Sequence, residues 1–245
     1  MEMLLVVPCF RESARIGHFL PELCAEMDRL GGIRVLVVED GSGEDEQAKM
    51  AALLAGWRRQ YACLAEPLLL VENLGKGGAV YAGWAQAGEA DWVAFVDADG
   101  ASPVREVSRL VQLARAQGQP HRALFASRVM MLGRKVQRLL KRHLLGRIYA
   151  TLVSEMLGIP VYDSQCGLKL VPRAAFEKVA ASLQIMGFAF DVELLVALLK
   201  SGCEVEEVPT DWQEIPGGKV RLIHDSVRMA KDVWHIRAGR GKVTN

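Results

Sequence analysis

Two aspartates separated by one residue, Asp97 and Asp99, directly follow the apolar run at 92–96. Carboxylates placed in this way at the end of a buried strand can point at one hard cation. Mg²⁺ typically takes one or two carboxylates and completes its coordination with substrate phosphates and water. It then neutralises a leaving diphosphate as a Lewis acid. The competing interpretation is a solvated turn, in which aspartate is common. The position after a buried strand favours the metal site.

A glycine-rich segment at 73–79 carries a lysine, Lys76. A glycine-rich entry to a helix can attract phosphates, although an ordinary helix start with a surface lysine explains the segment equally well. The spacing is not that of a Walker A loop. No G-x-G-x-x-G follows the first apolar run, which disfavours a dinucleotide-dependent dehydrogenase.

The elements that must position these groups alternate along the first half of the chain. Short apolar runs predict buried strands at 4–7, 34–38, 68–71, 92–96 and 123–126. Periodic segments between them predict helices at 16–30, 44–60, 77–87 and 103–116. This alternation predicts an α/β fold with a mostly parallel central sheet and helices on both faces. Ligands of such sheets bind outside the carboxyl ends of the strands.

The second half of the chain is less regular. We expect strands at 167–171 and 204–208 and helices at 134–157, 173–180, 191–200 and 222–237. Asp191 and Glu193 lie in an apolar helix start, where capping or a bridge to a basic residue is at least as plausible as catalysis. The sequence shows no internal repeat, so we expect one domain over 1–238 and a flexible tail at 239–245.

Composition narrows the function classes. The 245 residues carry a formal net charge of +1, so no overall field points to nucleic acid as a partner. Five widely spaced cysteines without a C-x-x-C are typical of reduced thiols in a cytosol-facing protein. The longest apolar stretch, at 144–162, is interrupted by Arg147 and Glu155. We therefore expect no transmembrane segment.

A basic segment at 134–143 could bring the protein to a membrane. Its cations recur on one face of the predicted helix: Arg134, Arg138, Lys141 and Arg142. Such a face suits a bilayer interface with anionic head groups. Taken by itself, the segment is explained at least as well by a solvated helix face.

Taken together, the motifs resemble a known family. The segments at 8–13, 39–42, 73–79 and 97–101 resemble those of family 2 glycosyltransferases, which have the GT-A fold. Further segments at 163–169, 188–195 and 211–220 resemble the dolichyl-phosphate β-glucosyltransferases. Gly100, Ala101 and Ser102 follow the acid pair where the related mannosyltransferases usually have Leu-Gln. The resemblance covers nearly the whole chain.

The resemblance implies an inverting transfer of a hexose from a nucleotide-sugar, UDP-glucose, to a polyprenyl phosphate. Residues 1–128 would form the nucleotide-sugar-binding part and 129–238 the acceptor side. Donor-binding residues would be Pro8, Glu12, Asp40 on the uracil, Lys76 and Asp97. Asp99, with Asp97, would hold Mg²⁺ or Mn²⁺ on the diphosphate.

On the acceptor side, the resemblance implies that Arg128 and Lys219 meet phosphate charge, with Arg138 of the basic segment as a further candidate. Asp163 would be a candidate base. A phosphate monoester has a second pKa of about 6, so the acceptor needs little help in losing a proton. Cations that hold it should therefore matter more than a base.

Members of this family from eukaryotes often have an N-terminal membrane anchor. We expect no such anchor here, and thus a cytoplasmic protein in peripheral contact with the cytoplasmic face of a membrane. Three alternatives remain open. They are a glycosyltransferase that uses GDP-mannose or another acceptor, a nucleotidyltransferase, and a non-catalytic nucleotide-binding module. The single arginine and missing glycine at 8–13 disfavour the nucleotidyltransferase, and the intact acid pair disfavours the non-catalytic module.

Overall fold

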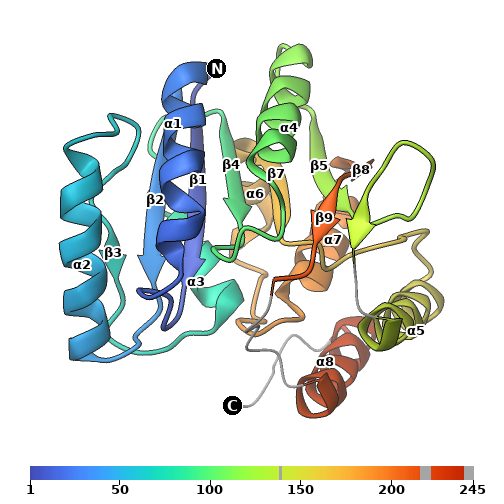
Figure 1. Cartoon of the computed structure of the whole chain (residues 1–245). Helices are drawn as coiled ribbons and strands as arrows, with labels where there is room; N and C mark the ends of the chain where they lie inside the picture. The colour runs from blue at the N-terminus through green and yellow to red at the C-terminus, as the bar shows by residue number, and fades with distance from the viewer. Residues whose placement is uncertain (138–139, 216–221, 240–245) are drawn as a thin grey trace.

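The computed structural model describes residues 1–137, 140–215 and 222–239. Within these ranges, seven strands form one sheet in the order β3-β2-β1-β4-β7-β5-β8 (Figure 1). The strands are β1 Met3–Cys9, β2 Ile33–Glu39, β3 Leu68–Leu69, β4 Trp92–Val96, β5 Arg122–Ser127, β7 Leu168–Pro172 and β8 Glu204–Pro209. All neighbours pair in parallel except β7, which runs antiparallel to both β4 and β5. The predicted α/β fold with a mostly parallel sheet is confirmed.

Helices cover both faces of the sheet, as the alternation of strands and helices predicts (Figure 1). Successive strand side chains point to opposite faces, so Leu5 and Val7 join one core cluster while Leu4 and Val6 join the other. The first cluster is closed by α1 Leu20–Leu30, α2 Glu44–Arg58 and α4 Val104–Ala116. The second is closed by α3 Lys76–Trp84, α5 Leu140–Leu157, α6 Arg173–Ala180, α7 Phe190–Lys200 and α8 Leu222–Arg237.

The basic helix predicted at 134–157 is wrong at its beginning, because α5 starts at Leu140. Val136 and Gln137 instead form a short strand, β6 Val136–Gln137, which pairs in parallel with β9 Trp212–Gln213. Arg134 lies before β6 and forms an ion pair with Glu106. It therefore cannot share a helical face with the later cations. The long-range pairing with residues 212–213 overrides the local helical pattern.

Two further boundaries differ from the predictions. The helix predicted at 16–30 is divided into a short 3₁₀ turn, η1 Ile16–His18, and α1. The strand predicted at 68–71 shrinks to two residues, and Val71 is fully exposed. A short edge strand of this kind offers little backbone for pairing with another chain.

Candidate active site

The candidate site lies along one edge of the sheet, the edge that points downward in Figure 1. The parallel strands β1, β2, β4 and β5 end at this edge, and the antiparallel β7 begins there. Asp40, Asp97 and Arg128 directly follow β2, β4 and β5. Asp163 reaches the same edge through its ion pair with Arg128. The structure thus brings these side chains to the edge that the strand pattern predicts, while their individual roles stay predictions.

The two aspartates lie after β4, near the middle of the edge. The Asp97 amide donates to the Gly167 carbonyl over 2.9 Å, and the Ala101 amide donates to Asp99 Oδ1 over 2.9 Å. Lys76 Nζ lies 2.7 Å from Asp97 Oδ1. Burial raises the pKa of Asp99, and the charge of Asp97 raises it further. Because neighbouring carboxylates disfavour each other's ionisation, a cation bound between them would be stabilised.

The donor atoms of this pair suit a hard divalent cation. In the described part of the chain, no three or more His, Cys, Asp and Glu side chains are grouped to hold a metal ion. Mg²⁺ at phosphate-transfer sites characteristically takes one or two carboxylates and draws its other ligands from substrate phosphates and water. Asp97 and Asp99 therefore fit the predicted Mg²⁺ or Mn²⁺ site, provided that a diphosphate completes it.

Because Gly167 has no side chain, it leaves room for the Asp97 carboxylate. A Cβ built at this glycine would lie 1.9 Å from Asp97 Oδ2. We expect Gly167→Ala to displace that carboxylate and to lower kcat by about 10²-fold, since small misplacements at a reacting centre cost about that much. Gly56→Ala is the matched control, because its Cβ would meet no atom within 4 Å.

Steady-state kinetics of the expected transfer reaction and thermal unfolding of both glycine variants test this prediction. The Gly56 variant should keep wild-type kcat and gain up to about 1 kcal/mol of stability from its helical position. Wild-type kcat in the Gly167 variant would show that the position of the Asp97 carboxylate does not matter.

Helix α3 begins at Lys76, and its first turn packs against the segment before α7. The amides of Gly77 and Gly78 both donate to the Met186 carbonyl, over 2.7 and 3.2 Å. A Cβ at Gly77 would lie 2.5 Å from the Phe190 Cβ. The glycines therefore permit close packing, and these two amides are not directed at a phosphate. What the segment contributes to the site is the Lys76 ammonium.

Lys169 and Asp191 form a second ion pair, which is fully buried. Lys169 Nζ lies 2.7 Å from Asp191 Oδ1 and donates to the Cys166 carbonyl over 2.7 Å, and both ionic side chains are buried. Burial alone would lower the pKa of Lys76, but Asp97 and Asp191 outweigh it and raise that pKa. Sequence reasoning left Lys169 without a role. The predicted bridge from Asp191 to a basic residue is confirmed.

Asp40 fastens the loop that precedes α3. Its Oδ1 accepts the Leu74 amide over 2.7 Å, and its Oδ2 accepts the Gly75 amide over 3.0 Å and the Asn73 side chain over 2.9 Å. Burial raises the pKa of Asp40 to about 6, and the two backbone amides limit the rise. The structure gives this carboxylate a loop-holding function. Its predicted contact with a uracil base stays a prediction.

This raised pKa predicts a pH dependence of stability. The folded state binds the Asp40 proton more tightly than the unfolded state, so the unfolding free energy should fall as the pH rises from about 4 to about 6. Above about 6 the contribution should be constant. Denaturant titrations of the wild type and Asp40→Asn over this range isolate the effect. The stability of the wild type relative to the variant should decrease with pH, and a constant difference would contradict the prediction.

Pro8 and Glu12, both predicted to bind the donor, lie in β1 and shortly after it. Pro8 is in β1, opposite Val38 of β2. The Glu12 carboxylate is buried and accepts hydrogen bonds from Arg15 Nε over 2.9 Å and Arg15 Nη2 over 2.7 Å. This bond, with a smaller contribution from the charge of Asp99, raises the pKa of Arg15. Glu12 is therefore electrostatically linked to the acid pair, and its predicted contact with the donor is untested.

Arg128 and Asp163, both predicted on the acceptor side, form an ion pair. Arg128 Nε lies 2.6 Å from Asp163 Oδ2, Nη2 lies 2.7 Å from Oδ1, and the Arg128 amide also donates to Oδ2 over 3.0 Å. Glu207 of β8 fixes the backbone at Asp163, because its carboxylate accepts hydrogen bonds from the Tyr162 and Asp163 amides, each over 2.7 Å. The guanidinium is thus fixed in position from two strands and a loop. Sequence reasoning gave Glu207 no role.

The same contacts bear on the predicted base. Burial alone would raise the pKa of Asp163, but Arg128 holds it well below its usual range. A carboxylate with such a low pKa is a weak proton acceptor. The geometry therefore favours Asp163 as the residue that orients Arg128, whose guanidinium also lies 5.5 Å from the centre of the Trp212 ring.

Two predicted phosphate-binding residues, Arg138 and Lys219, lie outside the described residues. No helix in the ranges 1–137, 140–215 and 222–239 has both the length and the apolar character needed to cross a bilayer.

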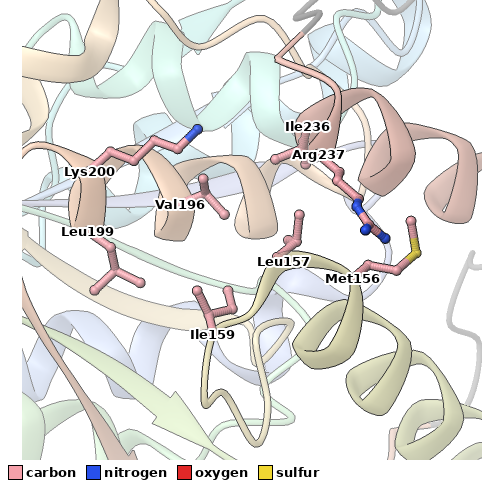
Figure 2. A pocket seen from close by; sticks show the side chains of 8 residues that line it. All are labelled: Met156, Leu157, Ile159, Val196, Leu199, Lys200, Ile236 and Arg237. Carbon is pink, nitrogen blue, oxygen red and sulfur yellow. The ribbon is translucent and has the colours of Figure 1, made fainter.

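A largely apolar pocket of about 280 Å³ opens between α5, α7 and α8 (Figure 2). Its lining consists of Met156, Leu157, Ile159, Val196, Leu199, Lys200, Ile236 and Arg237. Its α7 residues Val196, Leu199 and Lys200 lie about 7 to 14 Å from Asp191 along the helix axis, at 1.5 Å per residue, and none of the candidate site residues lines it. The pocket is therefore separate from the candidate active site.

Comparison with known proteins identifies a family. The family model described as "Glycosyl transferase family 2" matches residues 4–180. The dolichyl-phosphate beta-glucosyltransferase of Saccharomyces cerevisiae is 31% identical over 250 residues, which cover 95% of this chain and 73% of the yeast protein. The enzyme of the same name from Mus musculus is 32% identical over 247 residues, covering 96% of this chain and 75% of the mouse protein.

Solved structures confirm the predicted GT-A fold. Glucosyl-3-phosphoglycerate synthase from Mycobacterium tuberculosis, in complex with Mn²⁺, UDP and phosphoglyceric acid, matches with a TM-score of 0.63 and 20% identity. The match covers 100% of this chain and 80% of the mycobacterial chain.

Proposed function

The chain belongs to glycosyl transferase family 2, and from this premise we propose that it transfers glucose from UDP-glucose to a polyprenyl phosphate such as dolichyl phosphate. One observation carries the proposal. An acid pair suited to a metal-bound diphosphate and a guanidinium suited to a phosphate monoester lie along the same edge of the sheet. The names of the yeast and mouse relatives supply the sugar and the acceptor.

On the donor side, Asp99 and Asp97 would hold Mg²⁺ or Mn²⁺, as the donor atoms allow and as the Mn²⁺ and UDP in the mycobacterial synthase support. Such an ion supplies Lewis-acid stabilisation of the leaving diphosphate. Lys76, kept protonated by the surrounding aspartates, adds a fixed positive charge beside Asp97. Asp40 shapes the donor side by holding the loop at 73–75.

On the acceptor side, Arg128 would hold the lipid phosphate through the planar fork of donors that suits phosphate oxygens. A phosphate oxygen attacks the anomeric carbon of glucose from the face opposite the UDP oxygen. The new carbon–oxygen bond forms as the bond to UDP breaks, so the configuration inverts to β. The phosphate is already largely a dianion at neutral pH, so no protein base is needed.

The acceptor also suggests where the enzyme works. A polyprenyl chain resides in a bilayer, so the protein would meet it by peripheral contact with the membrane surface, at the cytoplasmic face where nucleotide-sugars are available. The sequence supplies further cations at 138–142 that would support that contact.

A transfer assay with labelled donors tests the proposal. UDP-glucose and, separately, GDP-mannose are supplied with polyprenyl phosphate, detergent and Mg²⁺ or Mn²⁺, and label in the organic extract is counted. We expect label from UDP-glucose that disappears with EDTA. Label from GDP-mannose alone would overturn the donor. Hydrolysis or binding of UDP-glucose without lipid label would overturn the acceptor.

A further inference from the structure

The loop between β5 and β6 exposes three consecutive large apolar residues. Met130, Met131 and Leu132 are 63%, 50% and 99% exposed. Single exposed apolar residues are common on protein surfaces, but a contiguous group usually marks a contact surface. These three residues, called here the apolar tip, take no part in the site described above.

The apolar tip is built on a defined turn. The Arg134 amide donates to the Met131 carbonyl over 3.2 Å, and Gly133 has a φ of 84°. This places Leu132 at the apex, a position that polar or small residues usually occupy. The returning strand is fixed by the pairing of β6 with β9, where the Trp212 amide donates to the Lys135 carbonyl over 2.9 Å. The fold therefore holds three apolar side chains in water.

The position of the apolar tip links it to the acceptor. It begins two residues after Arg128, whose side chain and amide are both held by Asp163. Exposed Lys135 flanks the tip on its other side. At a bilayer surface, acyl chains lie beneath anionic head groups. Apolar side chains next to a cation can therefore contact both layers at once. Three side chains are too few for a stable protein interface, which typically buries roughly 1,200 Å² or more.

We propose that the apolar tip, residues 130–132, is a membrane-docking element that inserts into the lipid surface and holds Arg128 at the level of the acceptor's phosphate. The inference rests on the proposed function for its biological meaning, because a polyprenyl phosphate is reached only at a bilayer. It adds a surface and a partner to that function. The partner is a lipid bilayer rather than a second copy of the chain or another protein.

Vesicle partitioning tests the docking element without any transfer reaction. The full chain is sedimented with vesicles of phosphatidylcholine containing about 20% phosphatidylserine. We expect the double variant Met131→Ser, Leu132→Ser to bind about tenfold more weakly than the wild type, because two inserted side chains are lost. Both side chains are exposed, so thermal unfolding should be unchanged.

Val71→Ser is the matched control. Val71 is also fully exposed, but it follows β3 at the opposite end of the sheet from β5 and β8. This variant should bind vesicles like the wild type. Vesicle binding by the double variant equal to that of the wild type would overturn the proposal. The same loss of vesicle binding in Val71→Ser and in the double variant would also overturn it. Failure of the wild type to bind vesicles would also overturn the proposal. So would dimerisation of the wild type that is lost in the double variant.

Transfer assays separate this inference from the function on which it rests. With a short-chain acceptor in detergent, the double variant should transfer at the wild-type rate. With a long-chain acceptor in vesicles, its transfer rate should fall by about tenfold. Equal losses with both acceptors would overturn the docking role. If the wild type transfers to no lipid while vesicle binding still depends on the apolar tip, the proposed function fails and the docking element stands.

Discussion

Replacing Asp99 by asparagine is expected to reduce glucosyl transfer by about 10³-fold or more while leaving the fold intact. The substitution keeps the shape of the side chain, and its amide oxygen can still accept the Ala101 amide. What it removes is the charge that would hold a divalent cation on the diphosphate. Transfer from UDP-glucose in the presence of Mg²⁺ or Mn²⁺ measures the loss.

Stability should move in the opposite direction from activity. Burial and the neighbouring Asp97 raise the pKa of Asp99, so ionising this carboxyl disfavours the folded state, and Asp99→Asn should be at least as stable as the wild type at neutral pH. Asp45→Asn is the control, since Asp45 is an exposed acid in the first turn of α2. Two results together would contradict the metal site. They are transfer by Asp99→Asn at a rate within about 3-fold of the wild-type rate, and full wild-type activity in the presence of EDTA.

The part of the site at the carboxyl ends of the parallel strands was predictable because it follows from local pattern. Five apolar runs predicted five strands, and each motif was assigned to the carboxyl end of one of them. Parallel order then required Asp40, Asp97 and Arg128 to lie at the same edge of the sheet. The detailed contacts were not predictable in the same way. The glycines at 77 and 78 have the composition of a phosphate loop, yet they serve packing against residues 185–190.

The rest of the site depends on long-range pairing, which periodicity does not reveal. An apolar run does not show its direction, so nothing indicated that β7 enters antiparallel and brings Gly167 against Asp97. Strand β6 was hidden in a helical pattern because its partner lies about 75 residues later in the chain. One signal was available: Lys169 interrupts an apolar strand, and a lysine buried in this way requires a partner. Asp191, in an apolar helix start, was the complementary residue.

Removing the Arg128 side chain, in Arg128→Met, is expected to damage both stability and transfer. The Asp163 carboxylate would stay buried without its bidentate partner, and breaking a buried ion pair from one side costs about 3–5 kcal/mol. Transfer should fall by about 10²-fold or more, because the acceptor phosphate would lose its fixed cation. Denaturant titration and the transfer assay measure the two losses. Arg105→Met is the control, since the Arg105 side chain is largely exposed where it pairs with Asp211 and should contribute little.

The double variant Arg128→Met, Asp163→Asn distinguishes a catalytic role from a structural one. Neutralising the aspartate removes the uncompensated charge and keeps an acceptor for the Arg128 backbone amide, so most of the lost stability should return. Transfer should stay low, because no guanidinium is present for the phosphate. Recovery of transfer along with stability would show that Arg128 acts only by compensating Asp163. Recovery of stability alone is the result expected if the pair exists to hold a phosphate-binding guanidinium in place.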